Sequence, residues 1–266
     1  MPEGDTVFAA ADRLRNGLAG KIIDRSDFRV PALATVDLSG REVTSVRSVG
    51  KHLLIDVAES TDNTSRDPRP VSIHSHLKME GVWHVHRIGT RWRRPAYQAR
   101  IVLRAGGTEA VGFDLGVLEL LHDPDDRLAY LGPDLLDPDW DRDEAIRRLE
   151  AHPDLEIGLA LLDQRLMAGV GNVYRCEVCF LRRVLPTRPV SSVDIPAMVD
   201  LCRRTLWDNR LRTARTTTGQ NAPNARTWVY GRGGQLCRRC ATPIELGFMG
   251  PSGEDRVIYY CPVCQQ

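Results

Sequence analysis

No run of about 18 apolar residues occurs in this 266-residue sequence, so it predicts no membrane-spanning helix. The opening MPEGDTVFAA also lacks the basic and apolar regions of a secretory signal peptide, because Glu3 and Asp5 come first. We therefore expect a cytoplasmic protein, in which thiols stay reduced. In that setting seven cysteines, an odd number, indicate metal ligands or free thiols rather than a disulfide framework.

Lysine is nearly absent, since only Lys21, Lys51 and Lys78 occur, and arginine carries most of the positive charge. The formal net charge of +1 hides an uneven distribution, because residues 175–239 contain thirteen arginines against four acidic residues. This asymmetry favours a polyanionic partner for the C-terminal half, where positive charge attracts phosphates. A solvated arginine-rich surface has the same composition, so charge alone does not decide between the two interpretations.

The spacing of apolar residues predicts an α+β protein. A first helix follows Asp5, which we expect to cap it. Alternating β-branched runs, typical of an antiparallel sandwich or barrel, follow at 21–30, 41–57, 71–86, 99–103 and 111–121. From 144 to 207 the spacing is helical. We divide the chain into a β-sandwich domain (1–131), a Pro- and Asp-rich linker (132–143), a helical domain (144–228) and a small C-terminal segment (229–266).

The C-terminal segment contains two CxxC pairs, formed by Cys237, Cys240, Cys261 and Cys264. Four thiolates at this spacing suit one structural zinc ion, and so short a segment would draw much of its folding free energy from the metal. With four protein ligands the ion would have no open position for catalysis. The remaining cysteines, at 176, 179 and 202, are interpreted as buried side chains.

His74 and His76 form a second candidate metal motif, because alternate residues of a strand face one side. Some metal-dependent hydrolases begin this way, and His52 and His122 could add ligands. Alternation on a half-exposed strand produces the same spacing, and no HExxH companion occurs. A metal-dependent hydrolase that uses His74 and His76 is kept as an alternative.

The chain opens with Pro2-Glu3, and removal of Met1 would expose a secondary amine. An α-amino group has a pKa of about 8, so a useful fraction is neutral and nucleophilic at neutral pH. Attack on the anomeric carbon of a nucleotide sugar would expel the base and leave an iminium. The adjacent carboxylate could serve as general acid and base. Pro and Glu are also common in the first turn of an ordinary helix.

Four stretches together resemble the formamidopyrimidine-DNA glycosylase/endonuclease VIII family: Pro2-Glu3-Gly4, Gly50-Lys51, LLDQRLMAGVGNVYR at 161–175, and the terminal CxxC…CPxCQ. The helix-two-turn-helix stretch 162–172 is the most specific part. The resemblance implies a helix-led antiparallel β-sandwich, then a helix-two-turn-helix domain with a zinc ribbon, and damaged DNA in the cleft between. It also implies a monomer that contacts no membrane and is nucleoid-associated when bound to DNA.

The resemblance assigns roles position by position. Pro2 would be the Schiff-base nucleophile and Glu3 the proton shuttle at the sugar. Lys51, on the strand after Gly50, would contact a phosphate near the lesion and so count with Pro2 and Glu3 among the catalytic residues. Asn172, and Arg256 at the tip of the zinc-ribbon hairpin, would hold the phosphates that flank the everted nucleotide.

Three further positions refine the resemblance. Met79, in the turn Lys78-Met79-Glu80, would fill the space left by the flipped base, although an ordinary core methionine fits nearly as well. The Arg-Phe pair of the formamidopyrimidine branch is missing from FDLGVLE at 113–119, which favours the endonuclease VIII branch and oxidised pyrimidines. Thr6 replaces a glutamate frequent in the family, so either Asp5 fills that role or no second carboxylate does.

We therefore expect a bifunctional DNA glycosylase and AP lyase of base excision repair. It would remove an oxidised base, most readily a pyrimidine, and nick the strand by β/δ elimination through one Pro2 iminium. A non-catalytic zinc-ribbon DNA-binding protein is the second alternative, but it gives no reason for Pro2-Glu3.

Overall fold

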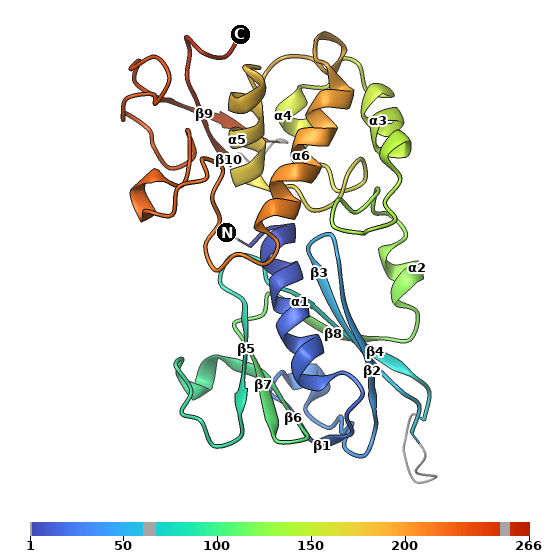
Figure 1. Cartoon of the computed structure of the whole chain (residues 1–266). Coiled ribbons are helices and arrows are strands. Elements are labelled where there is room, and N and C mark those ends of the chain that lie inside the picture. The colour runs from blue at the N-terminus through green and yellow to red at the C-terminus, as the bar shows by residue number, and fades with distance from the viewer. Residues whose placement is uncertain (1, 61–67, 251–255) are drawn as a thin grey trace. The chain divides into compact units, whose positions relative to one another are not determined.

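The computed structural model describes residues 2–60, 68–250 and 256–266 (Figure 1). It divides the chain into two compact units: Thr6–Ala129 with Pro2, and Tyr130–Gln266 with Glu3–Asp5. The second unit thus contains three residues from the N-terminal end of the chain. Within the described ranges, no helix is both long and apolar enough to cross a membrane.

The first unit is a helix followed by two antiparallel sheets. Helix α1 (Gly4–Leu18) begins in the second unit and continues into the first. The sheets have the strand orders β1-β6-β7-β5 and β2-β3-β4-β8. The strands are β1 (Ile23–Phe28), β2 (Val43–Val49), β3 (His52–Val57), β4 (Val71–His76), β5 (Val82–Arg87), β6 (Ala99–Ala105), β7 (Thr108–Phe113) and β8 (Val117–Leu121), followed by the short helix α2 (Pro124–Leu128).

One apolar core joins α1 to both sheets (Figure 1). Val7, Ala11 and Leu14 repeat at helical spacing on α1 and are almost completely buried. They belong to the same cluster as Ile23 of one sheet and Ile55 of the other. Burial of these apolar side chains away from water stabilises the unit. The helix and the two antiparallel sheets confirm the predicted helix-led antiparallel β-sandwich.

Three of the predicted runs are each two strands. The run 41–57 is β2 and β3, joined by a tight turn in which Gly50 has a φ of 57°. We had predicted Lys51 on the strand after Gly50, but it lies in this turn. The runs 71–86 and 111–121 each divide between the two sheets, and the turns contain Lys78 and Asp114 with φ of 52° and 47°. Apolar alternation continues across such turns, so it does not reveal them.

The second unit contains helices and a two-stranded hairpin. Its elements are α3 (Arg142–Glu150), α4 (Ile157–Ala160), α5 (Asn172–Arg182), α6 (Ile195–Asn209), β9 (Glu245–Met249) and β10 (Arg256–Tyr260). Asp141 and Asp194 accept hydrogen bonds from Glu144 N and Ala197 N and so cap α3 and α6. Helix α5 contacts both α6 and β10 (Figure 1), and its residues from Asn172 to Phe180 are buried. It is therefore the central helix of this unit.

The stretch 132–143, which we predict to be a linker, lies within the second unit and is packed in its first half. Asp134 forms a bridge with Ala168, and Leu135 and Leu136 are at most 2% exposed. Asp134 accepts from Leu136 N at 3.0 Å, so an aspartate that suggested a linker instead forms a local turn. The segment therefore belongs to the packed second unit.

Candidate active site and metal centre

The carboxylate of Glu3 is fully buried at the start of α5. Its Oε2 accepts from Gly171 N at 2.9 Å and from Tyr174 N at 3.3 Å, and its Oε1 accepts from Val173 N at 2.7 Å. The first N–H groups of a helix have no partner within the helix, and the helix dipole favours an anion there. The start of α5 thus holds Glu3 in one position.

Two glycines make room for these N-terminal residues. A Cβ at Gly171 would lie 2.4 Å from Glu3 Cδ, and one at Gly4 would lie 3.0 Å from Gly169 Cα. Gly4 N also donates to Gly169 O at 2.9 Å. The glycines of the most specific sequence stretch therefore allow a close backbone approach to Glu3 and Gly4.

A buried ion pair lies beside Glu3. Arg215 donates to Asp5 Oδ2 through Nε at 2.7 Å and to Oδ1 through Nη2 at 2.5 Å, and Tyr174 Oη donates to Oδ2 at 2.9 Å. Arg215 Nη1 lies 3.7 Å from Glu3 Oε1. Burial opposes the charge of Arg215, but the Glu3 and Asp5 carboxylates together raise its pKa above the ordinary value.

These contacts correct one prediction and add two residues. Asp5 is the second residue of α1 and does not precede the helix, as the predicted cap would, and its carboxylate binds Arg215 and Tyr174. Burial, followed by the Asp5 carboxylate, raises the pKa of Tyr174, so its phenol remains a hydrogen-bond donor. No pattern in the sequence predicts these roles of Arg215 and Tyr174, because no spacing connects residue 5 with residue 215.

The first unit contains three of the predicted site residues. Pro2 is half-buried, and Met1 before it lies outside the described residues. Lys51 is half-buried in the β2–β3 turn. Met79 lies in the turn after β4 and is 59% exposed, which excludes the alternative of a core methionine. Gly81 N donates to Leu77 O at 2.9 Å and closes this turn.

Asn172 and Arg256 lie on neighbouring elements of the second unit. Asn172 begins α5 and is only 4% exposed. Its Nδ2 donates to Val257 O at 2.9 Å, and its Oδ1 accepts from Arg175. Arg256 is the exposed first residue of β10. The amide of Asn172 therefore joins α5 to the hairpin next to Arg256, and the phosphate contacts of both residues stay predictions.

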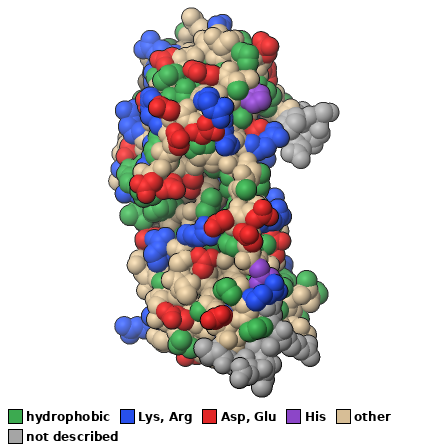
Figure 2. Space-filling view, turned by 90° about the vertical axis from the view of Figure 1, so that its right-hand side faces the viewer, with side chains coloured by type: hydrophobic (Ala, Val, Ile, Leu, Met, Phe, Trp, Pro, Cys, Tyr) green, Lys and Arg blue, Asp and Glu red, His purple; other side chains and the backbone are tan. Residues whose placement is uncertain are grey.

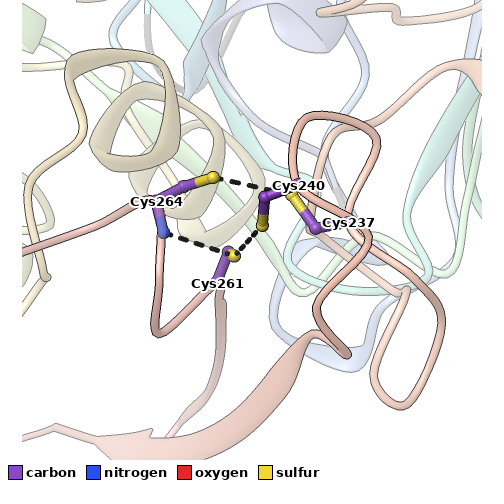
Figure 3. A group of neighbouring side chains, drawn as sticks. All are labelled: Cys237, Cys240, Cys261 and Cys264. Carbon is purple, nitrogen blue, oxygen red and sulfur yellow. Dashed lines mark hydrogen bonds between the residues drawn. The ribbon is translucent and has the colours of Figure 1, made fainter.

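Four cysteine side chains converge in the C-terminal segment (Figure 3). They are Cys237, Cys240, Cys261 and Cys264, and their sulfur atoms all lie within 4.8 Å of one another. Cys264 N also lies 3.4 Å from Cys261 Sγ. This compact set of sulfur donors fits a single metal ion. In the part of the chain that the structure describes, it is the only group of three or more residues suited to one.

The histidines of the alternative metal motif form a hydrogen-bonded cluster instead. His52 Nδ1 lies 2.8 Å from His74 Nε2, and His74 Nδ1 lies 2.9 Å from Glu119 Oε1. His76 Nδ1 accepts from Lys78 N at 3.0 Å. Burial lowers the pKa of His52 to about 3 and that of His76 to about 4. These contacts give the metal-dependent hydrolase no support.

The other cysteines are buried, as predicted. Cys176, Cys179 and Cys202 are completely inaccessible to solvent. Burial raises the pKa of Cys176 to about 11 and also raises the pKa of the other two thiols. These side chains are therefore neutral thiols within the second unit at neutral pH.

The arginine excess in residues 175–239 overstates the exposed positive charge. Arg175 and Arg232 are at most 7% exposed, and Arg215 is paired with Asp5. On the face shown in Figure 2, basic and acidic side chains are intermingled. Part of the composition that suggested a polyanionic partner thus serves to hold the second unit together.

The chain combines a helix-led β-sandwich, a helical region and a four-cysteine segment, and solved structures with the same fold are known. A Lactococcus lactis Fpg bound to DNA with N7-benzyl-Fapy-dG matches with a TM-score of 0.76 at 22% identity, over 100% of both chains. The same protein bound to DNA with an oxidized pyrimidine matches with a TM-score of 0.75 at 21% identity, again over 100% of both chains. These structures show the fold.

The family follows from sequence profiles and closer relatives. The formamidopyrimidine-DNA glycosylase N-terminal domain matches residues 1–115, and the H2TH domain of that glycosylase matches residues 131–214. DNA-(apurinic or apyrimidinic site) lyase Nei2 of Mycolicibacterium smegmatis is 50% identical over 268 residues, 100% of this chain and 99% of that protein. Endonuclease 8 2 of Mycobacterium tuberculosis (strain CDC 1551 / Oshkosh) is 47% identical over 273 residues, 100% of both chains. The chain belongs to the formamidopyrimidine-DNA glycosylase/endonuclease VIII family of DNA repair glycosylases and AP lyases, in its endonuclease VIII-like branch.

Proposed function

We propose that this protein is a bifunctional DNA glycosylase and AP lyase that uses the terminal amine of Pro2 as its nucleophile. The observation that carries the proposal is the carboxylate of Glu3, next in sequence to Pro2, fully buried and held by three backbone N–H groups. A carboxylate fixed beside an amine can take its proton and pass it on. The printed name of the M. smegmatis relative, an abasic-site lyase, supports the same chemistry.

The proposed reaction begins when the Pro2 nitrogen attacks C1′ of an everted nucleotide. The bond from C1′ to the damaged base breaks, and the base leaves with the electron pair and takes a proton from water. Glu3 accepts the amine proton and passes it to O4′ as the C1′–O4′ bond opens, which leaves an iminium between Pro2 and C1′. Loss of a C2′ proton then expels the 3′ phosphate, loss of a C4′ proton expels the 5′ phosphate, and water hydrolyses the iminium.

The substrate that we propose is duplex or single-stranded DNA with an oxidised pyrimidine. Residues 113–119 lack the Arg-Phe pair of the formamidopyrimidine branch, and the M. tuberculosis relative is named an endonuclease 8. Met79, at the tip of an exposed turn, is the side chain that we propose to enter the DNA stack. Lys51, Asn172 and Arg256 are proposed to bind phosphates, and the protein is proposed to act as a monomer.

The metal that we propose for the four-cysteine cluster is one structural zinc ion. Cys237, Cys240, Cys261 and Cys264 would occupy all positions of a tetrahedral site, so the ion would stabilise the ribbon and leave the reaction to Pro2 and Glu3. The short hairpin β9–β10 packs against α5, which would transmit this stabilisation to the second unit.

Borohydride reduction tests the nucleophile. An iminium formed on abasic-site DNA is reduced to a stable covalent adduct, and peptide mapping should locate that adduct at Pro2. An adduct at Lys51 or Lys78, or base release by a mature chain that keeps Met1, would contradict the mechanism. Oligonucleotides with oxidised pyrimidines, oxidised guanine or uracil, tested in parallel, determine the lesion preference.

Glu3→Gln tests the proton carrier. Glutamine keeps the size of the side chain but cannot carry the proton, so we expect excision of a damaged base to fall to a small residual rate while DNA affinity is nearly unchanged. Excision at the rate of the unmodified protein would remove Glu3 from the mechanism. Loss of both base excision and strand cleavage, with normal DNA binding, would show that the Glu3 carboxylate is needed in both reactions.

A further inference from the structure

We propose that Arg215 is a positioning residue for base excision, which holds the proton-carrying carboxylate of Glu3 in place and is itself held by Asp5 and Tyr174. This inference rests on the proposed function, because it requires Glu3 to carry the proton. It assigns a role to Asp5 that differs from a second proton shuttle.

The guanidinium of Arg215 lies near one of the two carboxylate oxygens of Glu3, Oε1. Oε2 accepts two backbone N–H groups, from Gly171 and Tyr174, whereas Oε1 accepts one, from Val173. Arg215 Nη1 lies 3.7 Å from Oε1, on the less saturated oxygen. The guanidinium therefore acts through charge on the oxygen that has more capacity left for proton exchange.

Arg215 itself has little freedom. Its side chain is 15% exposed, and two of its nitrogens bind the two oxygens of Asp5, which is 4% exposed. The guanidinium also lies 4.9 Å from the centre of the Tyr174 ring, and the Tyr174 hydroxyl donates to Asp5. A bidentate pair of this kind has a defined direction, so Asp5 and Tyr174 determine where the third nitrogen points.

The charges around Glu3 make this arrangement more than packing. The groups that interact with Glu3 electrostatically include Arg215, Tyr174, Tyr230 and Cys176, and Asp5 binds the same guanidinium. The two tyrosines and the thiol have raised pKa values and stay neutral, so Arg215 is the cation of this described set. Without it, the buried carboxylates of Glu3 and Asp5 would lose the cation that both contact. Asp5 accepts from Arg215 through both of its oxygens and from Tyr174 through one, so we assign it the role of holding the guanidinium.

The test uses the full-length protein with its metal bound, and single-turnover excision from a duplex with an oxidised pyrimidine. Arg215→Met should slow excision by roughly 10²-fold, as expected for a catalytic group displaced by about 1 Å. Arg215→Lys should recover part of this loss, because it restores the charge without the bidentate geometry. Arg204→Met, an exposed arginine of α6, is the matched control and should excise at the normal rate with unchanged DNA affinity.

A double-mutant cycle separates positioning from general destabilisation. If Arg215 acts through Glu3, Arg215→Met should add no further loss to the residual rate of Glu3→Gln. Multiplicative losses in the double variant would overturn the inference. If Arg215→Met does not fold in urea titrations, Asp5→Asn and Tyr174→Phe provide the same cycle with smaller changes in volume.

The outcomes also separate this inference from the proposed function. Normal excision by Glu3→Gln would contradict the proposed function itself. Slow excision in Glu3→Gln together with normal excision in Arg215→Met and Asp5→Asn would contradict only the positioning role. Slow excision in all of these variants, without additivity, would support both.

Discussion

Glu177 shows how one buried acid can organise a long stretch of chain. It is fully buried in α5, accepts from Thr217 Oγ1, and accepts from the backbone N–H groups of Trp228, Val229 and Tyr230 at 2.8 Å each. Burial raises its pKa, while the hydrogen bonds act in the opposite direction. Glu177 therefore anchors the chain that leads into the four-cysteine segment.

We predict that Glu177→Ala strongly destabilises the second unit. Three backbone N–H groups would lose their acceptor, and each buried orphan costs about 1–3 kcal/mol, so the free energy of unfolding should fall by several kcal/mol. Urea unfolding followed by tryptophan fluorescence measures the loss. Glu150→Ala, at an exposed position of α3, should change the same quantity by less than about 0.5 kcal/mol. Similar stabilities for the two variants would contradict the anchoring role.

At the scale of elements, the start of α5 is built around Glu3. Gly171 precedes the helix with a φ of −124°, which alanine adopts without strain. A Cβ there would nevertheless lie 2.4 Å from Glu3 Cδ. The atoms in conflict belong to the end of a side chain, so the carboxylate should move while the helix remains.

We therefore predict that Gly171→Ala strongly lowers the rate of base excision but has only a modest effect on the free energy of unfolding. We expect excision to slow by roughly 10²-fold, because a small displacement of a catalytic group has an effect of this size. The free energy of unfolding should fall by no more than about 2 kcal/mol, within the usual range for point variants. Excision kinetics and urea titration on one preparation measure both. Normal excision by this variant would show that the observed position of Glu3 is unnecessary.

The sheet β2-β3-β4-β8 should make the first unit sensitive to acid. Burial is the main reason that the pKa values of His52 and His76 lie at about 3 and about 4, below the ordinary 6.5. Between pH 6.5 and about 4, the unfolded chain binds protons that the folded sheet does not. The free energy of unfolding should therefore fall as the pH falls through this window.

The expected slope is up to about 1.4 kcal/mol per pH unit for each histidine. Urea unfolding of the first unit at several pH values measures it. His52→Asn removes one of the two half-buried imidazoles and should flatten the dependence, whatever its effect on stability at neutral pH. The same slope in both proteins would mean that other groups titrate.

At the scale of the whole molecule, each unit has its own apolar cluster. One cluster joins α1 to the sheets, and another surrounds Cys237 and Cys261 together with Phe180 of α5. The proposed metal would therefore stabilise the second unit directly. The first unit should be insensitive to its removal.

Cys261→Ser should abolish stoichiometric zinc binding and lower the unfolding midpoint of the second unit only. Loss of one thiolate opens the tetrahedral site and weakens the ion that supports the hairpin. Metal analysis after gel filtration gives the zinc content. Calorimetry should resolve one unfolding transition for each unit, and only the midpoint of the second unit should be lower in the variant. Cys202→Ser is a useful comparison, since that thiol lies outside the cluster and zinc content should be unchanged. Tightly bound zinc in Cys261→Ser would instead revive the metal-dependent hydrolase.

Local patterns were sufficient for much of the molecule. The helical spacing of Val7, Ala11 and Leu14, the alternation along the strands and the two CxxC pairs all depend on neighbours within a few residues. The resemblance carried by 161–175 added the helix-two-turn-helix segment. The same reasoning did not predict the turns within the strand runs, because the alternation of apolar residues continues through Gly50 and Lys78.

The sequence by itself determined the α+β class and the four-cysteine site, and it drew attention to Pro2-Glu3, because each depends on residues that lie close together in the chain. Only the tertiary structure decided that Glu3 lies at the start of α5 and that Arg215 binds Asp5. Those partners are 168 and 210 residues apart in sequence. Their encounter depends on burial of the whole second unit, and a pair of charges at such separation has no periodicity to reveal it.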